Sequence, residues 1–174
     1  MRSIEDIGPS LPAIARRAIE AWAAGARRER PEPSELPAAP VFVTLRTKDG
    51  RLRGCIGTLR ATEPNVVFET ARSAVLAASQ DPRFAPVAPA EIAELRVEVS
   101  VLLPEEAVSG LAELDPQRYG VIVRDEGYRH GVLLPNVEGV DDAETQVSIA
   151  RRKAGIPEQA PVRLSRFRVM KYHG

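Results

Sequence analysis

The sequence has few of the residues from which common functional sites are built. Its 174 residues include one cysteine and two histidines. One cysteine excludes an internal disulfide, and so few cysteines and histidines leave no zinc-ligand spacing. We therefore expect no metal ion. No phosphate loop, Ser/His/Asp triad or haem motif is present either, so we expect no cofactor.

The sequence has no excess of positive or negative charge, because 24 Lys and Arg residues balance 24 Asp and Glu residues. Aromatic residues make up only 5% of the chain. Proteins that coat nucleic acid need a basic footprint, and those that hold single strands need aromatic stacking platforms. We expect no nucleic-acid partner, although a local basic patch is compatible with this balance.

Long hydrophobic runs are also absent, so no segment is expected to span a bilayer. The opening "MRSIEDIGPSLP" carries acidic residues and no apolar signal core, which favours a cytoplasmic location. What the sequence does have is a 44% share of hydrophobic residues, enough for a sizeable core. These features predict a globular protein without a membrane partner.

The length fits a single domain, which we expect to cover residues 1–174. Residues 1–30 are expected to form a helical region, and residues 31–40 a proline-rich connector. Residues 41–174 would then form the body of the domain. No internal repeat is visible in the sequence.

Three segments predict helices. "SLPAIARRAIEAWAAGARRER" has helical spacing and Ser10 as its expected cap. Its predicted buried face consists of Leu11, Ile14, Ala18, Ala21 and Trp22. "EPNVVFETARSAVLAASQ" predicts a helix capped by Asn65, and "DDAETQVSIARRKAG" predicts one that ends at Gly155.

The remaining segments predict strands. "LRVEVSVL" alternates strictly, "YGVIVRDEGYRHGVLLP" has the pattern of a hairpin, and "VRLSRFRVMKY" is typical of a closing strand. Hairpins mixed with a few helices indicate the α+β class rather than a regular βαβ repeat. We expect a mainly antiparallel sheet built from hairpins, with flanking helices.

The segment "VFVTLRTKDGRLRGCIGTL" predicts a hairpin with Asp49-Gly50 as a two-residue turn. Counting outward from that turn predicts the register of the two strands. The pairs on the apolar face are Val43 with Ile56, Leu45 with Gly54 and Thr47 with Leu52. The pairs on the other face are Arg46 with Arg53, Thr44 with Cys55 and Phe42 with Gly57.

The second face of this hairpin is the first candidate site. Arg46 and Arg53, directly opposite each other, would repel unless an acidic neighbour, solvent or an anionic ligand lay between them. Glu98 is the candidate acidic neighbour. If its strand lies beside residues 51–57, then Arg53, Cys55, Glu98 and Ser100 share one patch.

Cys55 has two interpretations. A nearby arginine lowers a thiol's pKa and makes the thiolate available as a nucleophile, while Gly54 and Gly57 allow a ligand to approach closely. Alternatively, Cys55 is a small buried residue and the glycines mark close packing. The sequence alone leaves both open.

Other candidates are weaker. Asp81 and Arg83 in "DPRF" are candidates for the wall of a cleft, or else a turn that stops a helix with Phe84 as its anchor. His130 is expected to face solvent from a hairpin. His173 is expected to lie at a frayed terminus.

The motifs "LRGCIGTL", "DPRFAPV", "LRVEVSVL", "GVLLP" and "ARRKAGI", in this order, resemble those of the AMMECR domain family. The resemblance runs from the first hairpin to "FRVMKY", and the N-terminal helix is in keeping with it. The family's central motif corresponds to Arg53, Gly54, Cys55, Ile56 and Gly57. Its "E-x-S" strand corresponds to Glu98 and Ser100, and its "D-x-R-F" turn to Asp81, Arg83 and Phe84. Asn136 departs from the glutamine that many relatives carry.

The resemblance implies an α+β fold with a larger and a smaller subdomain around a cleft. It also implies an intracellular protein whose activity is poorly defined. Prokaryotic relatives are similar to the first member of a three-part system that also contains a Memo-like protein and a radical-SAM protein. The Memo-like protein resembles class III non-haem-iron dioxygenases, so iron or S-adenosylmethionine would belong to these partners.

Two functions therefore stay open. The first is a ligand-binding or accessory component, with a cleft around "RGCIG" for a small anionic molecule. Its candidate ligand-binding residues are Arg46, Arg53, Gly54, Gly57, Ser100, Asp81 and Arg83. The second is an enzyme that acts on a small anionic substrate, with Cys55 as nucleophile and Glu98 as its assistant.

Overall fold

The computed structural model describes residues 3–28 and 35–174, which divide into two compact units. Unit 1 comprises the chain up to Leu102 together with Met170–Gly174, and unit 2 comprises Leu103–Val169. Each unit combines an antiparallel sheet with helices, so the expected α+β class is confirmed. Residues 31–34 of the expected connector lie outside the described residues.

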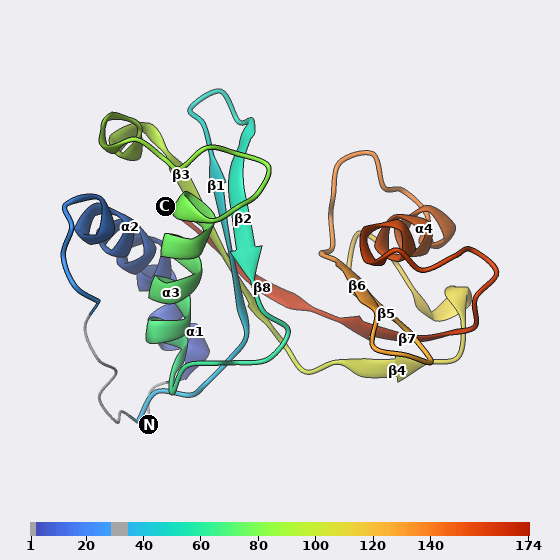
Figure 1. Cartoon of the computed structure of the whole chain (residues 1–174). Helices are drawn as coiled ribbons and strands as arrows, with labels where there is room; N and C mark the ends of the chain where they lie inside the picture. Colours follow the sequence, from blue (N-terminus) through green and yellow to red (C-terminus); the bar gives the residue numbers. More distant parts are fainter. Residues whose placement is uncertain (1–2, 29–34) are drawn as a thin grey trace. The chain divides into compact units, whose positions relative to one another are not determined.

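The elements of unit 1 are α1 (Ile4–Ile7), the 3₁₀ turn η1 (Gly8–Ser10), α2 (Leu11–Ala23), β1 (Val41–Arg46), β2 (Leu52–Gly57), α3 (Val66–Ser79), the 3₁₀ helix η2 (Pro89–Glu94), β3 (Arg96–Leu102) and β8 (Val169–His173). The strand order is β2-β1-β3-β8. Helices α2 and α3 cover one face of this sheet (Figure 1), where valines of β3 join the main hydrophobic core. The opposite face carries the polar residues of the alternating pattern.

The elements of unit 2 are β4 (Glu106–Val108), the 3₁₀ turn η3 (Leu111–Glu113), β5 (Gly120–Asp125), β6 (His130–Leu133), α4 (Ala143–Ala154) and β7 (Val162–Phe167). The strand order is β4-β7-β5-β6. Val147 and Ala150 of α4 pack with Val121 and Val123 of β5 in a second core. The predicted helix is confirmed, with Asp142 as N-cap and Gly155 as left-handed C-cap.

The two units repeat one plan. In each, a hairpin is followed by a helix, and the next strand returns beside the first strand of the hairpin: β1-β2-α3-β3 and β5-β6-α4-β7. A glycine of the hairpin lies under the helix in both units. A Cβ atom at Gly54 would overlap the Ala77 carbonyl oxygen, and one at Gly131 would overlap that of Ala150. The repeat is therefore one of architecture, which the sequence does not show.

The β1–β2 hairpin confirms four of the predicted pairs and corrects the turn. The pairs of Phe42, Val43, Thr44 and Leu45 with Gly57, Ile56, Cys55 and Gly54 are present. The loop has three residues, because the Thr47 amide donates to the Arg51 carbonyl over 2.9 Å. Gly50, with φ 89°, takes the left-handed position that this loop requires.

The longer loop shifts the register between Leu45 and Arg46. Arg46 therefore lies opposite Leu52, and Arg53 is the extra residue of a β-bulge on β2. The predicted pairs of Arg46 with Arg53 and of Thr47 with Leu52 are wrong. The hypothesis that an anion lies between Arg46 and Arg53 loses its geometric basis.

Two other boundaries differ from the prediction. The N-terminal helix α2 ends at Ala23, its residue Ala21 is exposed, and Ser10 makes no side-chain cap bond. The chain is already helical before Ser10, through α1 and η1. The expected single closing strand is two strands that break at Arg168, with β7 in the sheet of unit 2 and β8 in that of unit 1.

Candidate functional site

The polar face of the unit 1 sheet contains a row of side chains across three strands. Thr44 of β1 lies opposite Cys55 of β2 on one side and opposite Glu98 of β3 on the other. The expectation that β3 lies directly beside β2 is wrong, because β1 lies between them. Cys55 and Glu98 therefore share a face but are one strand further apart than expected.

Cys55, the one cysteine of the sequence, is half-buried. Its Sγ lies 3.2 Å from Thr44 Oγ1, and its backbone amide donates to Asp81 Oδ2 over 2.9 Å. The N–H of Cys55 points away from β1, so Thr44 and Cys55 form a non-hydrogen-bonded antiparallel pair. In such a pair the side chains approach most closely, which explains the contact between sulfur and hydroxyl.

Asp81 fixes the site from the loop that follows α3. Its buried carboxylate accepts bonds from the amides of Cys55 and Arg83 and from Arg83 Nε and Nη2, the last two over 3.0 and 2.8 Å. The bond from the Arg83 side chain contributes most to lowering the pKa of Asp81 to about 2. Asp81 is thus charged throughout the physiological pH range and ties β2 to this loop.

The Arg83 guanidinium and the Cys55 backbone amide donate to the same oxygen, Asp81 Oδ2. The pKa of Arg83 is raised, chiefly by its hydrogen bond to Asp81. Its side chain is 55% exposed. An exposed cation at this position attracts an anion from solvent.

Arg53, the arginine expected beside Cys55, is held elsewhere. Its Nε and Nη2 donate to the two carboxylate oxygens of Glu91 over 2.9 and 3.1 Å, and Nη1 donates to the Ala85 carbonyl over 2.9 Å. Its side chain is only 15% exposed. The acidic partner of Arg53 is Glu91 and not Glu98, so these bonds anchor the loop to β2. The Phe84 ring lies within 6 Å of the guanidinium groups of both Arg53 and Arg83, at 5.9 and 5.5 Å.

Glu98 is paired with the last strand of the sheet. Its carboxylate oxygens lie 3.6 Å from Lys171 Nζ and 3.6 Å from His173 Nδ1. His173 was expected at a frayed terminus but belongs to β8, and the next residue, Gly174, exchanges two backbone hydrogen bonds with Val97. The sequence carried no signal that β8 would bring Lys171 and His173 to Glu98.

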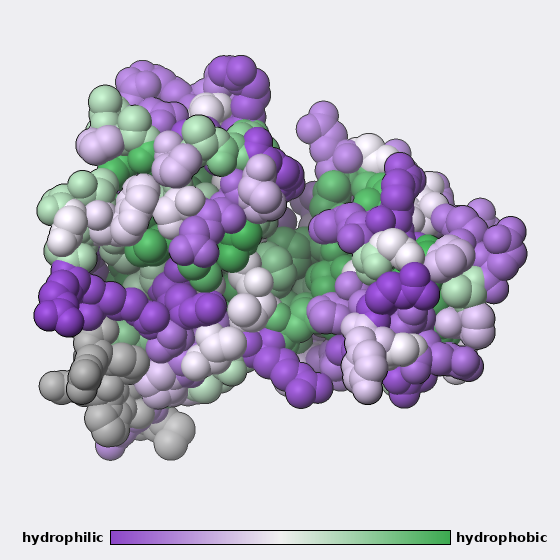
Figure 2. All heavy atoms as spheres, viewed as in Figure 1, coloured by the Kyte–Doolittle hydropathy of each residue, from purple (hydrophilic) through white to green (hydrophobic). Residues whose placement is uncertain are grey.

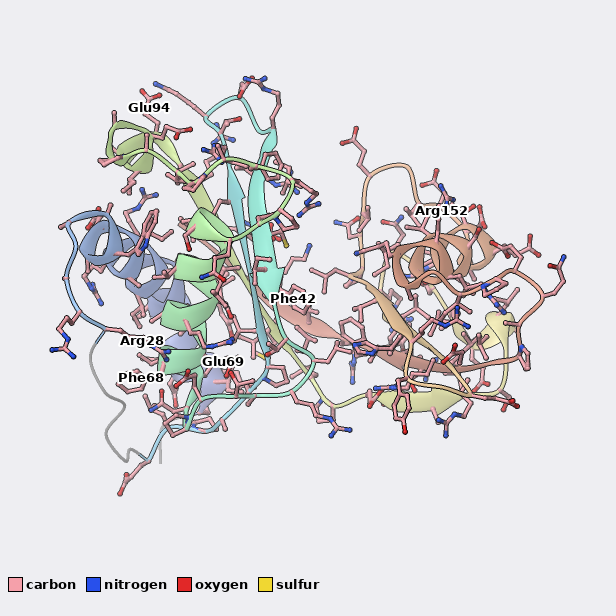
Figure 3. The ribbon with its side chains drawn as sticks, in the orientation of Figure 1. Arg28, Phe42, Phe68, Glu69, Glu94 and Arg152 are labelled. Carbon is pink, nitrogen blue, oxygen red and sulfur yellow. The ribbon has the colours of Figure 1, made fainter. Side chains whose placement is uncertain are left out.

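Ser100, Gly54 and Gly57, which were also predicted to bind a ligand, each have different neighbours. Ser100 is fully buried on the same face, and its hydroxyl has no hydrogen-bond partner among the described residues. Gly54 receives the carbonyl of Ala77, whereas a Cβ atom at Gly57 would overlap the Phe42 ring. Phe42 lies on the face of the sheet away from α3 (Figure 3). Both glycines therefore allow close packing within unit 1.

Arg46 and His130 are exposed. Arg46 lies at the end of β1 next to the hairpin tip, a region covered by hydrophilic residues (Figure 2), and its partner across β3 is Arg96. His130 lies on β6 of unit 2, facing solvent as predicted. Asn136 has a positive φ of 57°, a backbone conformation that asparagine tolerates better than most residues.

One buried residue next to the site was not anticipated. Glu69 of α3, labelled in Figure 3, is fully buried and accepts bonds from the amides of Thr62 and Glu63 over 2.6 and 2.8 Å. The Thr58 hydroxyl also donates to it over 3.0 Å. These bonds fix the segment that leaves β2 directly after "RGCIG".

Within residues 3–28 and 35–174, no three His, Cys, Asp or Glu side chains are placed to hold a metal ion. In the same residues, no helix has both the length and the apolar character needed to cross a bilayer.

The geometry defines a two-unit α+β protein whose "RGCIG" strand is tied to a "DPRF" loop. A sequence model of the AMMECR1 family matches residues 12–174. The chain therefore belongs to the AMMECR1 family.

The chain is similar to several members of this family in bacteria and archaea. A Thermotoga maritima protein is 52% identical over 77% of this chain and 77% of its own length. A Methanothermobacter thermautotrophicus protein is 38% identical, covering 97% of this chain and 94% of its own. A Clostridium acetobutylicum protein is 42% identical, but this chain matches only 28% of its length.

Among solved structures, the chain resembles an uncharacterised protein, PH0010, from Pyrococcus horikoshii. The TM-score is 0.84 and the identity 34%, with 95% of this chain and 90% of the other covered. The similarity supports the fold and the family.

Proposed function

We propose that this chain is a ligand-binding, accessory component that acts with a Memo-like protein and a radical-SAM protein. Its ligand would be a small anionic molecule bound on the polar face of the unit 1 sheet, around "RGCIG". One observation carries the proposal: buried Asp81 holds the exposed Arg83 guanidinium and the backbone amide of half-buried Cys55 on the same carboxylate oxygen. The two partners rest on the family resemblance alone.

The arrangement suits binding because it is rigid and leaves a donor available. Asp81 engages Nε and Nη2 of Arg83, and no described residue accepts a bond from Nη1. A guanidinium that is already oriented loses little further side-chain entropy when it binds an anion. The Thr44 hydroxyl and the Cys55 thiol would lie beside such an anion and could distinguish one ligand from another.

An enzyme with Cys55 as nucleophile is the alternative, favoured by the same position of Arg83. In this reading Glu98 is the assistant, acting across Thr44. Measuring the rate of Cys55 alkylation as a function of pH distinguishes the enzyme from the binding protein. A nucleophilic Cys55 would react rapidly near neutral pH, whereas an unperturbed thiol reacts only as the pH approaches about 8.5.

The binding proposal is tested with Arg83→Ala. Isothermal calorimetry would measure binding of a set of anionic metabolites and of the Memo-like protein to the wild type and to the variant. We expect the variant to lose roughly tenfold or more in affinity for the anion, because a charge-assisted hydrogen bond disappears.

The matched control is Arg152→Ala on α4 of unit 2, an exposed arginine (Figure 3) that should leave affinity unchanged. Thermal unfolding checks that both variants are folded. Absence of binding to every candidate, or binding that is the same in both variants, would refute the proposed function.

A further inference from the structure

Two arginines lie directly opposite each other on the polar face of unit 1. Arg46, the last residue of β1, is the register partner of Arg96, the first residue of β3. Their strands alternate, so both side chains lie on the face that carries Thr44 and Glu98. Both are exposed. The only hydrogen bond between either side chain and a described residue runs from Arg46 Nη1 to the Gly50 carbonyl over 3.3 Å.

Like charges placed directly opposite on a sheet are destabilising. The backbone register fixes the two Cα atoms, so the arginines cannot move apart by more than their side chains allow. A bound anion would turn this repulsion into two attractive contacts. A cross-strand pair of this kind is therefore a ready anion site where the chain supplies no carboxylate.

Unit 2 contains the matching pair with its carboxylate. Arg124 of β5 lies opposite Arg163 of β7, in the strand pair that corresponds to β1 and β3. There the two oxygens of Glu105 accept from Arg124 Nη1 and Nη2 over 2.9 and 3.1 Å. In unit 2 a carboxylate thus engages one arginine of the pair, whereas no carboxylate of the described residues contacts Arg46 or Arg96.

The acidic residues near the Arg46–Arg96 pair are engaged elsewhere. Glu98, two residues along β3, contacts Lys171 and His173. Asp49, in the hairpin loop, accepts bonds from Thr47 and Arg51. Glu94, two residues before Arg96, lies 3.7 Å from Lys48. Each of these carboxylates thus has its own partner.

We propose that Arg46 and Arg96 form a subsite for the phosphate group of a small phosphomonoester. Two guanidinium groups match a phosphate dianion in charge, and their planar forks match its oxygens. The rest of the ligand extends along the same face toward Thr44 and Cys55. The inference rests on the proposed function, whose anion it identifies, and it adds Arg96, which is not among the candidate ligand-binding residues named from the sequence.

The experiment follows backbone amide signals by NMR during titration with inorganic phosphate, phenyl phosphate and acetate. We expect phosphate and phenyl phosphate to shift signals of β1 and β3, with acetate at least tenfold weaker. Arg46→Ala and Arg96→Ala should each weaken phosphate binding by roughly tenfold or more. Binding should also weaken as the pH falls below about 6, where the phosphate becomes a monoanion.

Arg163→Ala is the matched control and should leave phosphate affinity unchanged. Equal affinity in the wild type, Arg46→Ala and Arg96→Ala would overturn the subsite, even if Arg83→Ala still abolished anion binding and so upheld the proposed function. A preference for an RNA oligonucleotide over phenyl phosphate would also overturn it, in favour of a nucleic-acid surface. Phenyl phosphate binding stronger than that of inorganic phosphate would support a small-molecule ligand.

Discussion

The carboxylate of Asp81 connects β2 with the loop that follows α3. It accepts from the amide of Cys55, from the amide of Arg83 and from the Arg83 guanidinium. The amide bond to Cys55 is made on the outer side of β2, which is an edge strand. An edge strand that is tied down by an acidic side chain is less open to pairing with other chains. Asp81 thus stabilises the strand and orients the cation of the site.

The substitution Asp81→Asn removes the charge of this carboxylate. The amide keeps the shape but loses the charge, so we expect a loss of about 2 kcal/mol in the free energy of unfolding at pH 7. In the wild type this contribution is complete above pH 3.8 and disappears as the pH falls through about 2. Between these values the unfolded state binds more protons, so acid lowers stability.

Urea unfolding at a series of pH values measures this effect. The difference between wild type and Asp81→Asn should shrink as the pH falls from about 4 to about 2, the range set by the two pKa values. Asp141→Asn changes an exposed carboxylate that has no side-chain hydrogen bond among the described residues, and should behave as the wild type. A difference that is constant with pH would contradict the role given to the Asp81 charge.

At the scale of elements, the contact between β2 and α3 depends on Gly54. The Ala77 carbonyl occupies the space that a side chain would need. We expect Gly54→Ala to lower the free energy of unfolding by roughly 1–3 kcal/mol, because either the helix or the strand must move. Chemical denaturation measures this loss.

Gly110→Ala is the control for that measurement. Gly110 has extended backbone and no heavy atom within 4 Å of an added Cβ, so the substitution should change stability little. Equal effects of the two substitutions would show that backbone entropy, rather than the Ala77 contact, explains the loss at Gly54.

The hairpin shows how far alternation alone predicts structure. Polar and apolar residues alternate from Val43 to Arg46, and four of the pairs predicted for this segment are present, including Thr44 with Cys55. The Asp49-Gly50 signal is compatible with loops of two or three residues. A two-residue turn of the type I′ form needs positive φ at both central residues, whereas here only Gly50 has it. Because the loop has three residues and not two, Arg53 is out of register with Arg46.

The partners of the site residues were harder to predict because they depend on strand order. Nothing local in "LRVEVSVL" distinguishes a neighbour of β2 from a neighbour of β1. Because β3 pairs with β1, Arg96 lies opposite Arg46, and Glu98 lies opposite Thr44. Glu91, which binds Arg53, lies on η2, and the loop between α3 and η2 carries no periodic signal.

At the scale of the whole molecule, unit 1 is assembled from two distant parts of the chain. Strand β8 pairs with β3, and Met170 and Tyr172 pack on the main core. Deletion of residues 170–174 should therefore destabilise unit 1 by exposing the edge of β3. Hydrogen exchange would show faster exchange of β3 amides, while those of β5 and β7 keep their protection.

A milder variant keeps this prediction testable if the deletion does not fold. Tyr172→Ala removes the ring that fills the space beside Gly8 and should accelerate exchange in unit 1 alone. Equal acceleration in both units would mean that they unfold as one cooperative body, contrary to the expectation from separate cores.

The placement of β8 sets the order in which the two sheets can be completed during translation. Every strand of the β4-β7-β5-β6 sheet comes from one continuous stretch of chain, so that sheet can close as soon as Phe167 has emerged. The other sheet starts first but must wait for the segment translated after all of unit 2. The unit that carries Cys55 is thus begun before unit 2 and completed after it.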